Sequence, residues 1–220
     1  MLKSIFDVVM ERRAGRLMDL VGASLPTEGP VLDLGSGTGH FSARLEREMG
    51  IEVVTADVTD IHVVGRAPLL IADGVLPFKE GTFSAALLFF MLGYPKDPGA
   101  VLEEAARVTR GPIILVQTVN SGRIGYAWHR GREFLWTFIA FHLSKLLGYV
   151  PRNAHFTMNT RRFYTAHTLQ RDVMSAGLRI RSRRERAVLP GRSLVVAGWT
   201  LDTASARGAK RRATAGKAHA

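Results

Sequence analysis

Residues 31–42, VLDLGSGTGHFS, place three glycines at alternate positions after an apolar run. Because glycine has no side chain and adopts positive φ angles readily, such a stretch lets the backbone turn sharply and approach a ligand. The helix expected from Thr38 onward would present free N–H groups to a negatively charged ligand group. Gly35, Gly37 and Gly39 therefore predict a loop that binds a nucleotide-like ligand.

Three acidic residues accompany three successive apolar runs. Asp33 stands two residues before the first glycine, Asp57 ends IEVVTAD and Asp73 ends PLLIAD. The carboxyl ends of parallel strands share one edge of a sheet, and an acid after the second strand commonly binds ribose hydroxyls there. An acid after the third strand can accept a hydrogen bond from the exocyclic amine of a base, and Asp33 can orient the loop or reach a cationic group. Each acid could also be a helix cap or a turn residue, but the ordered set predicts a site for a sugar, a base and a positive charge.

A dinucleotide is a second candidate ligand for this loop. The dinucleotide-binding pattern G-x-G-x-x-G requires its third glycine at position 40, where this chain has His40. The third glycine is Gly39 instead, and Asp33 and Asp73 stand outside that pattern. An NAD-dependent oxidoreductase is therefore the least favoured function.

Predicted strands and helices alternate around these residues, which indicates a parallel sheet in a doubly wound α/β fold. Strands are expected over 30–35, 51–57, 68–73, 83–92, 111–118, 179–189 and 192–201. Helices are expected over 38–50, 97–110 and 167–178. An amphipathic helix over 4–21 precedes the sheet, and its expected apolar face includes Ile5, Val8, Val9, Leu17, Leu20 and Val21.

The composition narrows the class of protein. The chain has 220 residues, of which 46% are apolar, so it is long enough for one core of ordinary size. It has no cysteine, which excludes disulfides, thiolate zinc sites and cysteine nucleophiles, and no metal site is predicted. Acids and arginines interrupt the N-terminal segment MLKSIFDVVMERRAG, so no signal peptide is predicted and a cytoplasmic location is expected.

The basic character belongs to the C-terminal half. Residues 121–192 hold 14 Lys and Arg against 3 Asp and Glu, whereas residues 1–120 hold 11 against 15. This asymmetry indicates an anionic partner or, equally, a solvated basic face. The same half contains a long insertion at 120–160, whose apolar stretch 134–150 is short for a membrane span and carries Lys145. A lid helix packed on the core, or a helix in a membrane interface, is expected instead.

Together these motifs resemble those of class I S-adenosylmethionine-dependent methyltransferases of the small-molecule, methyltransferase type 11-like kind. The resemblance is close over residues 28–120, through VLDLGSGTG, the acid after strand two, ADGVLPF and FSAALLFFMLGYPKDPGAVLEEAARV, and weaker over TAHTLQRDVMSAGL. It implies a Rossmann-like, doubly wound, mostly parallel seven-stranded sheet with helices on both faces, an antiparallel last strand and a helical insertion after strand five. The implied single domain spans 1–205, with an N-terminal helix at 1–22, a substrate-capping insertion at 120–166 and a basic disordered tail at 206–220.

The resemblance also implies S-adenosylmethionine as the cofactor and a role for each motif. The glycine loop and its preceding acid would surround the methionine part, and the acid after strand two would bind the ribose beside an apolar residue against the adenine. The third acid and the next backbone group would bind the adenine amine and a ring nitrogen, and a phenylalanine ending strand four would border the methyl group. The implied cofactor-binding residues are Asp33, Gly35, Ser36, Gly37, Gly39, Asp57, Val58, Asp73, Gly74 and Phe89.

Two positions depart from the family's pattern. Relatives usually have Asp where this chain has Ser84, and often have a His pair where it has Gly93 and Tyr94. The second departure removes a common contact with the acceptor. An oxygen or carbon acceptor needs a base for its proton. The candidates outside the cofactor motifs are Tyr94, His129, His142, His155, Tyr164 and His167, of which Tyr94, His129 and His155 are predicted for that role. The two histidines are favoured because they lie in the insertion, although a histidine in an apolar segment is more often structural.

The predicted acceptor is an oxygen or carbon atom of a small hydrophobic or amphiphilic molecule, lipid-like molecules included. Aromatic residues and arginines crowd the insertion, which favours such an acceptor or peripheral contact with an anionic membrane, whereas a lid that only completes the core is the alternative. Without cysteine the covalent route to 5-methylated pyrimidines is closed, and no Asn/Asp-Pro-Pro-aromatic segment follows strand four, so nucleic acid is not favoured. The alternative function is a basic nucleic-acid-binding protein with a methyltransferase fold, as an RNA methyltransferase or an inactive module. No oligomeric state follows from the sequence.

Overall fold

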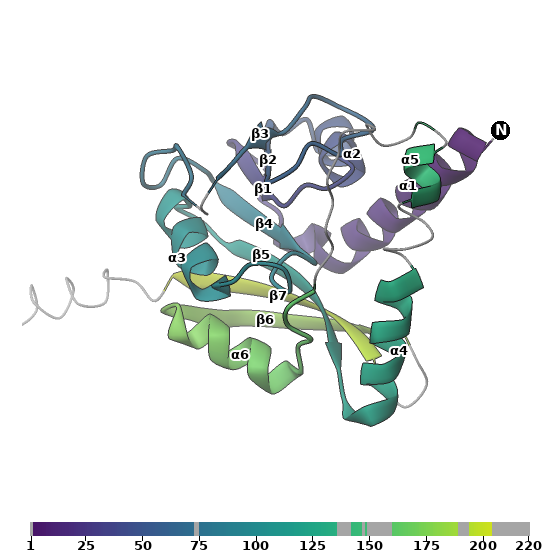
Figure 1. The fold of residues 1–220 in the computed structure, drawn as a ribbon. Coiled ribbons are helices and arrows are strands. Elements are labelled where there is room, and N and C mark those ends of the chain that lie inside the picture. The colour runs from purple at the N-terminus through teal and green to yellow at the C-terminus, as the bar shows by residue number, and fades with distance from the viewer. Residues whose placement is uncertain are drawn as a thin grey trace, which may run out of the picture.

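The computed structural model describes residues 2–72, 75–135, 142–146, 148, 160–188 and 194–203. Their strands form one seven-stranded sheet in the order β3-β2-β1-β4-β5-β7-β6 (Figure 1). The bounds are β1 (Val31–Leu34), β2 (Val53–Asp57), β3 (Leu69–Leu70), β4 (Ala85–Phe89), β5 (Ile113–Asn120), β6 (Leu178–Ala187) and β7 (Leu194–Thr203). The third strand is much shorter than predicted, and the fifth continues two residues beyond its predicted end.

The first five strands run parallel, and β1, β2 and β4 end nearly level with one another, whereas β5 continues four residues beyond the position opposite Phe89. Leu34 of β1 lies opposite Ala56 of β2 and Leu88 of β4, so the loops that follow these strands leave from the same edge. β7 runs antiparallel to both of its neighbours, β5 and β6. The predicted Rossmann-like, mostly parallel sheet with an antiparallel last strand is therefore confirmed.

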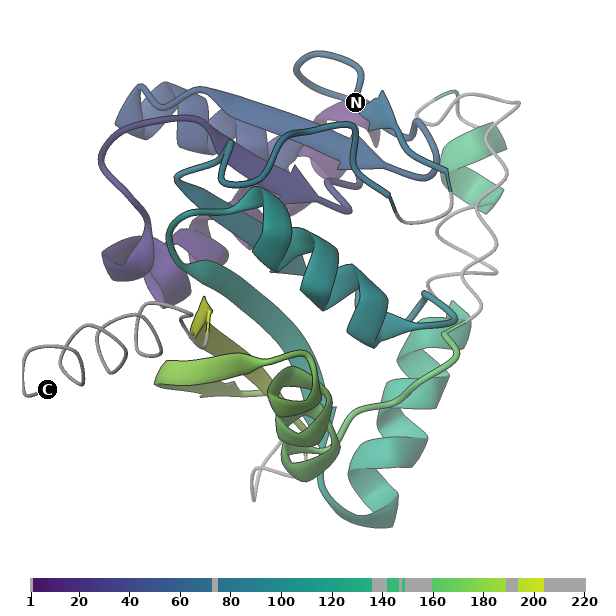
Figure 2. The ribbon, with the colours of Figure 1, turned by 90° about the vertical axis from the view of Figure 1, so that its left-hand side faces the viewer.

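Helices cover both faces of the sheet, as predicted (Figure 2). One face carries α1 (Leu2–Val21), the short 3-10 helix η1 (Gly22–Ser24) and α2 (His40–Met49), and the other carries α3 (Pro98–Val108) and α6 (Ala166–Ser175). Side chains alternate along β1, because successive strand residues point to opposite faces. Val31 therefore joins the core beneath α1 and α2, and Leu32 joins the core beneath α3 and α6.

The apolar face predicted for α1 is partly wrong. From Phe6 onward, where the side chains of this helix are described, the buried residues are Met10, Ala14, Leu17 and Val21, which recur every three or four positions and so form one stripe. The side chain of Ile5, also predicted on this face, lies outside the described part. Val8 and Val9 were expected on that face, but they are 45% and 49% exposed because they lie to its side. Leu17 and Val21 are buried as expected.

The predicted helical insertion follows β5. It contains α4 (Gly122–Leu135), which packs beside β5 and β7, and the short α5 (His142–Leu146). The chain then returns along the end of β5, where Val119 bridges Tyr164. The rest of the apolar stretch 134–150 and the predicted tail 206–220 lie outside the described residues. Among the helices that the structure describes, none has the length and apolar character needed to cross a membrane.

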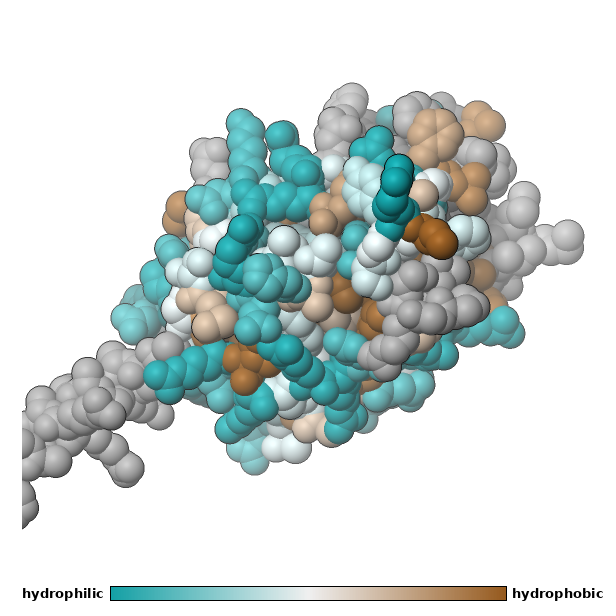
Figure 3. All heavy atoms as spheres, turned by 90° about the horizontal axis from the view of Figure 1, so that it is seen from below, coloured by the Kyte–Doolittle hydropathy of each residue, from teal (hydrophilic) through white to brown (hydrophobic). Residues whose placement is uncertain are grey.

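β6 forms one edge of the sheet and is strongly basic. Eight of its ten residues are exposed, namely Arg179 and the unbroken run from Arg181 to Ala187, and they include all five of its arginines. The face of the molecule on the side of α6 is correspondingly mostly hydrophilic (Figure 3). Arg183 stacks over the ring of the buried Trp199, with 4.9 Å between its Cζ atom and the ring centroid.

Candidate functional site

The glycine loop links the end of β1 to the start of α2. Gly35, Gly37 and Gly39 have φ angles of 78°, 59° and 80°, which all lie in the left-handed region. A Cβ atom at Gly39 would lie 2.5 Å from the carbonyl oxygen of Val64, so no other residue fits there. A Cβ atom at Gly37 would meet nothing within 4 Å, which leaves its backbone open to a ligand. The loop thus has the conformation predicted from the spacing of its glycines.

Asp57 ties the end of β2 to this loop. Its Oδ2 atom accepts a hydrogen bond from the Gly37 N–H at 2.9 Å, and its Oδ1 atom accepts from Val58 and Thr59 at 2.7 and 3.3 Å. Burial raises the pKa of Asp57, and these three N–H groups partly offset that rise because they favour the ionised form. The neighbouring Val58 side chain is 71% exposed, so apolar surface is available beside the carboxylate for an adenine ring.

Asp33 is a buried carboxyl group inside β1 and is only 2% exposed. Its Oδ2 atom accepts a hydrogen bond from the Ser42 hydroxyl, which joins the strand to the first turn of α2. Burial raises the pKa of Asp33 to about 7, and the nearby Asp57 adds to that rise, whereas Ser42 opposes it. Asp33 is therefore a group that titrates near neutral pH at the base of the loop.

A residue that the sequence did not indicate, His62, holds the loop from outside. Its Nδ1 atom lies 2.6 Å from the carbonyl oxygen of Arg66, and its Nε2 atom lies 2.8 Å from the Ser36 hydroxyl. Because a carbonyl oxygen only accepts, Nδ1 carries a proton and donates to Arg66, and Nε2 forms the second hydrogen bond with the Ser36 hydroxyl. No spacing rule connects a histidine in an irregular segment to a glycine loop 26 residues earlier, so only the fold reveals this contact.

The turn after β4 connects the glycine loop to a cavity. Phe89, which ends β4, packs edge-to-face on Phe41 of α2, with ring centroids 4.7 Å apart. Phe90 has a positive φ of 57°, and the side chain of the next residue, Met91, lies against the backbone of Gly35. The loop and the cavity wall that begins at Phe90 are therefore in direct contact.

The cavity lies between α1, the turn after β4, β5, α4 and the end of β6, and has a volume of about 540 Å³. This volume is within the usual range for small-molecule sites. Part of its wall is apolar and comes from Val9, Leu17, Leu20, Val188 and Val196. Another part is polar and comes from Tyr94, Gln117, Thr118 and His129.

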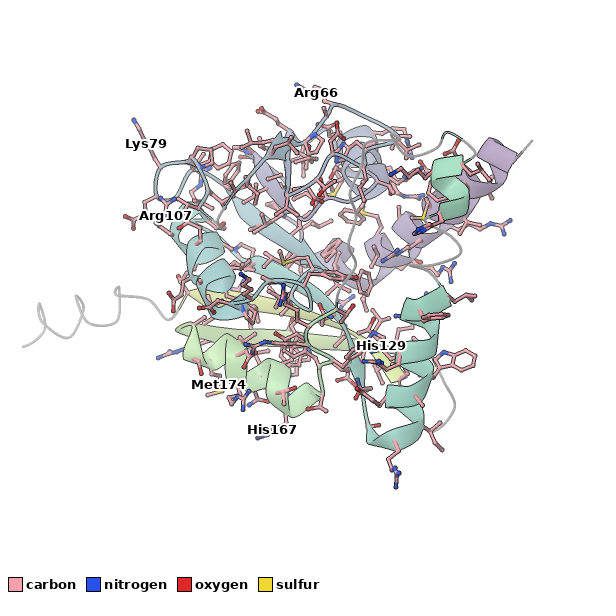
Figure 4. The ribbon with its side chains drawn as sticks, viewed as in Figure 1. Arg66, Lys79, Arg107, His129, His167 and Met174 are labelled. Atoms are coloured by element: carbon pink, nitrogen blue, oxygen red, sulfur yellow. The ribbon has the colours of Figure 1, made fainter. Side chains whose placement is uncertain are left out.

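Two of the three predicted catalytic residues, Tyr94 and His129, line this one cavity. His129 lies on the inner side of α4, toward the sheet (Figure 4), and is 3% exposed. Its ring packs edge-to-face on Phe163 at 4.9 Å. Burial, assisted by the positive charge of Arg132, lowers the pKa of His129 to about 4, so its imidazole is neutral at physiological pH. The third candidate, His155, lies outside the described residues, as do the predicted adenine-binding residues Asp73 and Gly74.

Gly93, one of the departures from the family's pattern, has a structural explanation. Its carbonyl oxygen accepts hydrogen bonds from the N–H groups of Arg161 and Arg162 at 2.8 and 3.1 Å. A Cβ atom at this position would lie 3.0 Å from the Arg162 carbonyl oxygen, so a histidine here would push the returning chain away. The glycine therefore lets the segment from Thr160 onward close the cavity wall.

A family model described as a methyltransferase domain matches residues 7–183. The chain belongs to this methyltransferase family. The methyltransferase is 28% identical to the malonyl-[acyl-carrier protein] O-methyltransferase of Yersinia pestis over 181 residues, which are 76% of this chain and 67% of that relative.

Solved structures share the fold of this methyltransferase. The [4+2]-cyclase SpnF matches with a TM-score of 0.60 and 14% identity, over 88% of this chain and 80% of its own. The geranyl diphosphate C-methyltransferase of Streptomyces coelicolor matches with a TM-score of 0.56 and 11% identity, over 88% of this chain and 79% of its own. At such identities these two structures show the likeness of fold alone.

S-adenosylmethionine is the cofactor of this methyltransferase, in agreement with its family. The described residues fit that group. The backbone of Gly37 is open, the Asp57 carboxylate contacts it from the end of β2, and the exposed Val58 side chain is next to Asp57. The relatives support methylation of small molecules and leave the acceptor unspecified. The individual cofactor and catalytic residues stay predictions.

Proposed function

We propose that this methyltransferase transfers a methyl group to an oxygen or carbon atom of a small hydrophobic or amphiphilic molecule bound in the cavity. The observation that carries this proposal is the contact between the cavity and the cofactor loop. Met91 packs on Gly35, and the preceding residue, Phe90, lines the cavity, so an acceptor held there lies beside the loop. The apolar part of the wall suits a hydrophobic acceptor, because burying apolar surface favours binding.

The protein's task in this reaction is to align the acceptor, exclude water and take up a proton. S-adenosylmethionine, which the glycine loop and Asp57 would hold, would supply an electrophilic methyl group bonded to a positively charged sulfur, and the sulfur would keep the bonding electron pair on transfer. The neutral imidazole of His129 can accept the acceptor's proton, and Tyr94 can position the acceptor by a hydrogen bond. The apolar wall from Val9 and Val196 excludes water from the same space.

Transfer of label from methyl-tritiated S-adenosylmethionine into the small-molecule fraction of a cell extract tests this function. We expect label in organic-soluble products with the wild-type chain, and a fall in kcat of about 100-fold or more for His129→Gln, because a positioned base contributes at least that much. The His167→Gln variant is the matched control, since His167 is exposed on α6 (Figure 4). Label confined to RNA or protein would overturn the proposed acceptor class, and an unchanged kcat in His129→Gln would overturn the role of this histidine.

We further propose that the enzyme works in the cytoplasm in peripheral contact with an anionic membrane, the source of an amphiphilic acceptor. The support comes from the outer side of α4. Ile124, Trp128 and Leu135 are 77%, 55% and 56% exposed, and their spacing of four and seven residues places them on one side of the helix. Arg123 and Arg130 are exposed elsewhere on the same helix, with the Cζ atom of Arg130 5.6 Å from the ring centroid of Phe163, so α4 combines exposed apolar side chains with positive charge, as helices at membrane interfaces do.

Sedimentation with lipid vesicles checks the membrane contact. We expect the chain to sediment with phosphatidylglycerol vesicles at low salt and much less with phosphatidylcholine vesicles, because each basic residue near an anionic surface adds to binding. Trp128→Ser should reduce the bound fraction several-fold, whereas Met174→Ser, which removes an equally exposed apolar side chain from α6, should not. Equal sedimentation with both lipids, or none with either, would contradict the contact.

A further inference from the structure

Four arginines from three separate elements line the cavity. Arg13 and Arg16 belong to α1, Arg132 belongs to α4 and Arg186 belongs to β6. All four are exposed, so they surround the mouth of the cavity rather than lying in its depth. Among the described residues that line the cavity, none is Asp or Glu. The wall is therefore strongly positive as well as partly apolar.

Two acids close to these arginines in the sequence, Glu11 and Glu185, face elsewhere. Glu11 of α1 pairs with Arg44 and Arg47 of α2, at 3.5 and 3.4 Å, on another side of that helix. Along β6, Glu185 lies opposite Ala197 and Arg186 lies opposite Val196. Since adjacent strand residues point to opposite faces of a sheet, Glu185 projects away from the face that carries the cavity.

Contacts with the wall hold two of the arginines in place. The Cζ atom of Arg13 lies 4.7 Å from the ring centroid of Phe90, and Arg132 donates a hydrogen bond to the Thr118 hydroxyl at 3.4 Å. The hydrogen bond of Arg132 uses one donor of its planar guanidinium, which has five, and leaves others for a ligand. Val9, Arg13, Arg16 and Leu20 follow one another every three or four residues, so α1 presents one stripe that is apolar at its ends and cationic between them.

We propose that the acceptor carries an anionic group, a phosphoryl or carboxylate group, which the arginines at the mouth of the cavity bind while its apolar part enters the cavity. This inference rests on the proposed function and narrows its substrate class. Guanidinium groups match the oxygens of both anions with paired, charge-assisted hydrogen bonds. The anion anchors the acceptor and fixes which of its atoms faces the cofactor loop.

Calorimetric titration with three probes of equal chain length tests the anchor. Octyl phosphate, octanoate and octan-1-ol are titrated into the chain with and without S-adenosylhomocysteine. We expect at least one of the two anions to bind about tenfold or more tightly than the alcohol, because a hydrogen bond to a charged group contributes that much. The anion that binds more tightly distinguishes a phosphoryl from a carboxylate group.

Variants of the cavity arginines and of matched arginines outside it locate the binding. Arg16→Gln and Arg186→Gln should each weaken anion binding about tenfold and leave octan-1-ol binding unchanged. The affinity of these variants for the anion should depend on salt concentration no more steeply than that of the wild type. Arg16→Lys should retain most of the affinity. Arg12→Gln on α1 and Arg179→Gln on β6 are the controls and should bind as the wild type does.

The outcomes separate this inference from the proposed function. The anionic anchor is overturned if neither octyl anion binds more tightly than octan-1-ol. It is also overturned if the anion binds Arg16→Gln and Arg186→Gln as tightly as it binds the wild type. Failure to bind S-adenosylhomocysteine overturns the methyl-transfer function instead, and is read from a separate titration of the same protein. Circular dichroism of each variant establishes that a lost affinity does not reflect lost folding.

Discussion

Asp57→Ala is expected to weaken binding of S-adenosylhomocysteine by about 100-fold or more. The carboxylate is the residue predicted to bind the ribose hydroxyls, and each hydrogen bond to a charged group contributes about 1.5–3 kcal/mol. The substitution also removes the acceptor of the Gly37, Val58 and Thr59 N–H groups. The loop would then lose the contact that holds it against the end of β2, so both the ligand contact and the loop geometry are affected.

Isothermal titration calorimetry measures this effect, with thermal unfolding as the check that the variant is folded. Asp57→Asn separates the two contributions, because it keeps one acceptor oxygen for the loop and removes the charge. Glu52→Ala is the matched control, since Glu52 is an exposed acid just before β2. An unchanged affinity in a folded Asp57→Ala chain would show that the cofactor site has been assigned to the wrong edge of the sheet.

The second large effect is on the dependence of stability on pH, where two buried groups act in opposite directions. Asp33 has a pKa of about 7 in the folded chain against 3.8 ordinarily, so its neutral form stabilises the fold at low pH and this contribution is lost as pH rises through about 7. His129 has a pKa of about 4 against 6.5, so its contribution is present above pH 6.5 and is lost as pH falls through about 4. The raised pKa of Asp57 adds to the first effect, and the lowered pKa of His40 adds to the second.

Substitution of either group should therefore leave the pH dependence of stability that is due to the other. At 1.36 kcal/mol per pKa unit, each contribution is on the order of 3–4 kcal/mol. As pH rises from 4 to 8, the free energy of unfolding of Asp33→Asn should increase relative to that of the wild type. That of His129→Gln should decrease relative to the wild type over the same interval. Both changes should be of that order of magnitude. Urea unfolding at a series of pH values gives the two difference curves. Parallel curves for the variants and the wild type would mean that neither group is perturbed as its burial indicates.

The sequence predicted the sheet well because its strongest signals are local. Alternating apolar runs and helical periods gave the order of elements, and the glycine spacing gave a loop whose three φ angles are all positive. Local signals predicted the ends of elements less well. For example, β3 contains only Leu69–Leu70 of the strand predicted over 68–73. Asp33 was predicted near a strand end, and its place inside β1 against Ser42 depends on the packing of α2, which no spacing within the strand records.

The cavity was harder to predict because its parts are distant in the sequence. Tyr94 and His129 were named as candidates, but nothing in the sequence indicated that Arg13, Arg16 and Arg186 would join them at one cavity. In α1 the pattern was read as a single apolar face. Packing instead divides this helix into two sides, with Ala14 and Val21 toward the sheet and Val9, Arg13 and Arg16 toward the cavity.

The arginines of β6 have a consequence for the behaviour of the chain in concentrated solution. As an edge strand, β6 exposes unpaired N–H and C=O groups along one side, which another chain could use to extend the sheet. Two such edges brought together would place rows of like charges, among them Arg179, Arg181 and Arg184, within a few ångströms of one another. The repulsion between these rows opposes edge-to-edge aggregation, and it weakens as salt screens the charges or as a polyanion neutralises them.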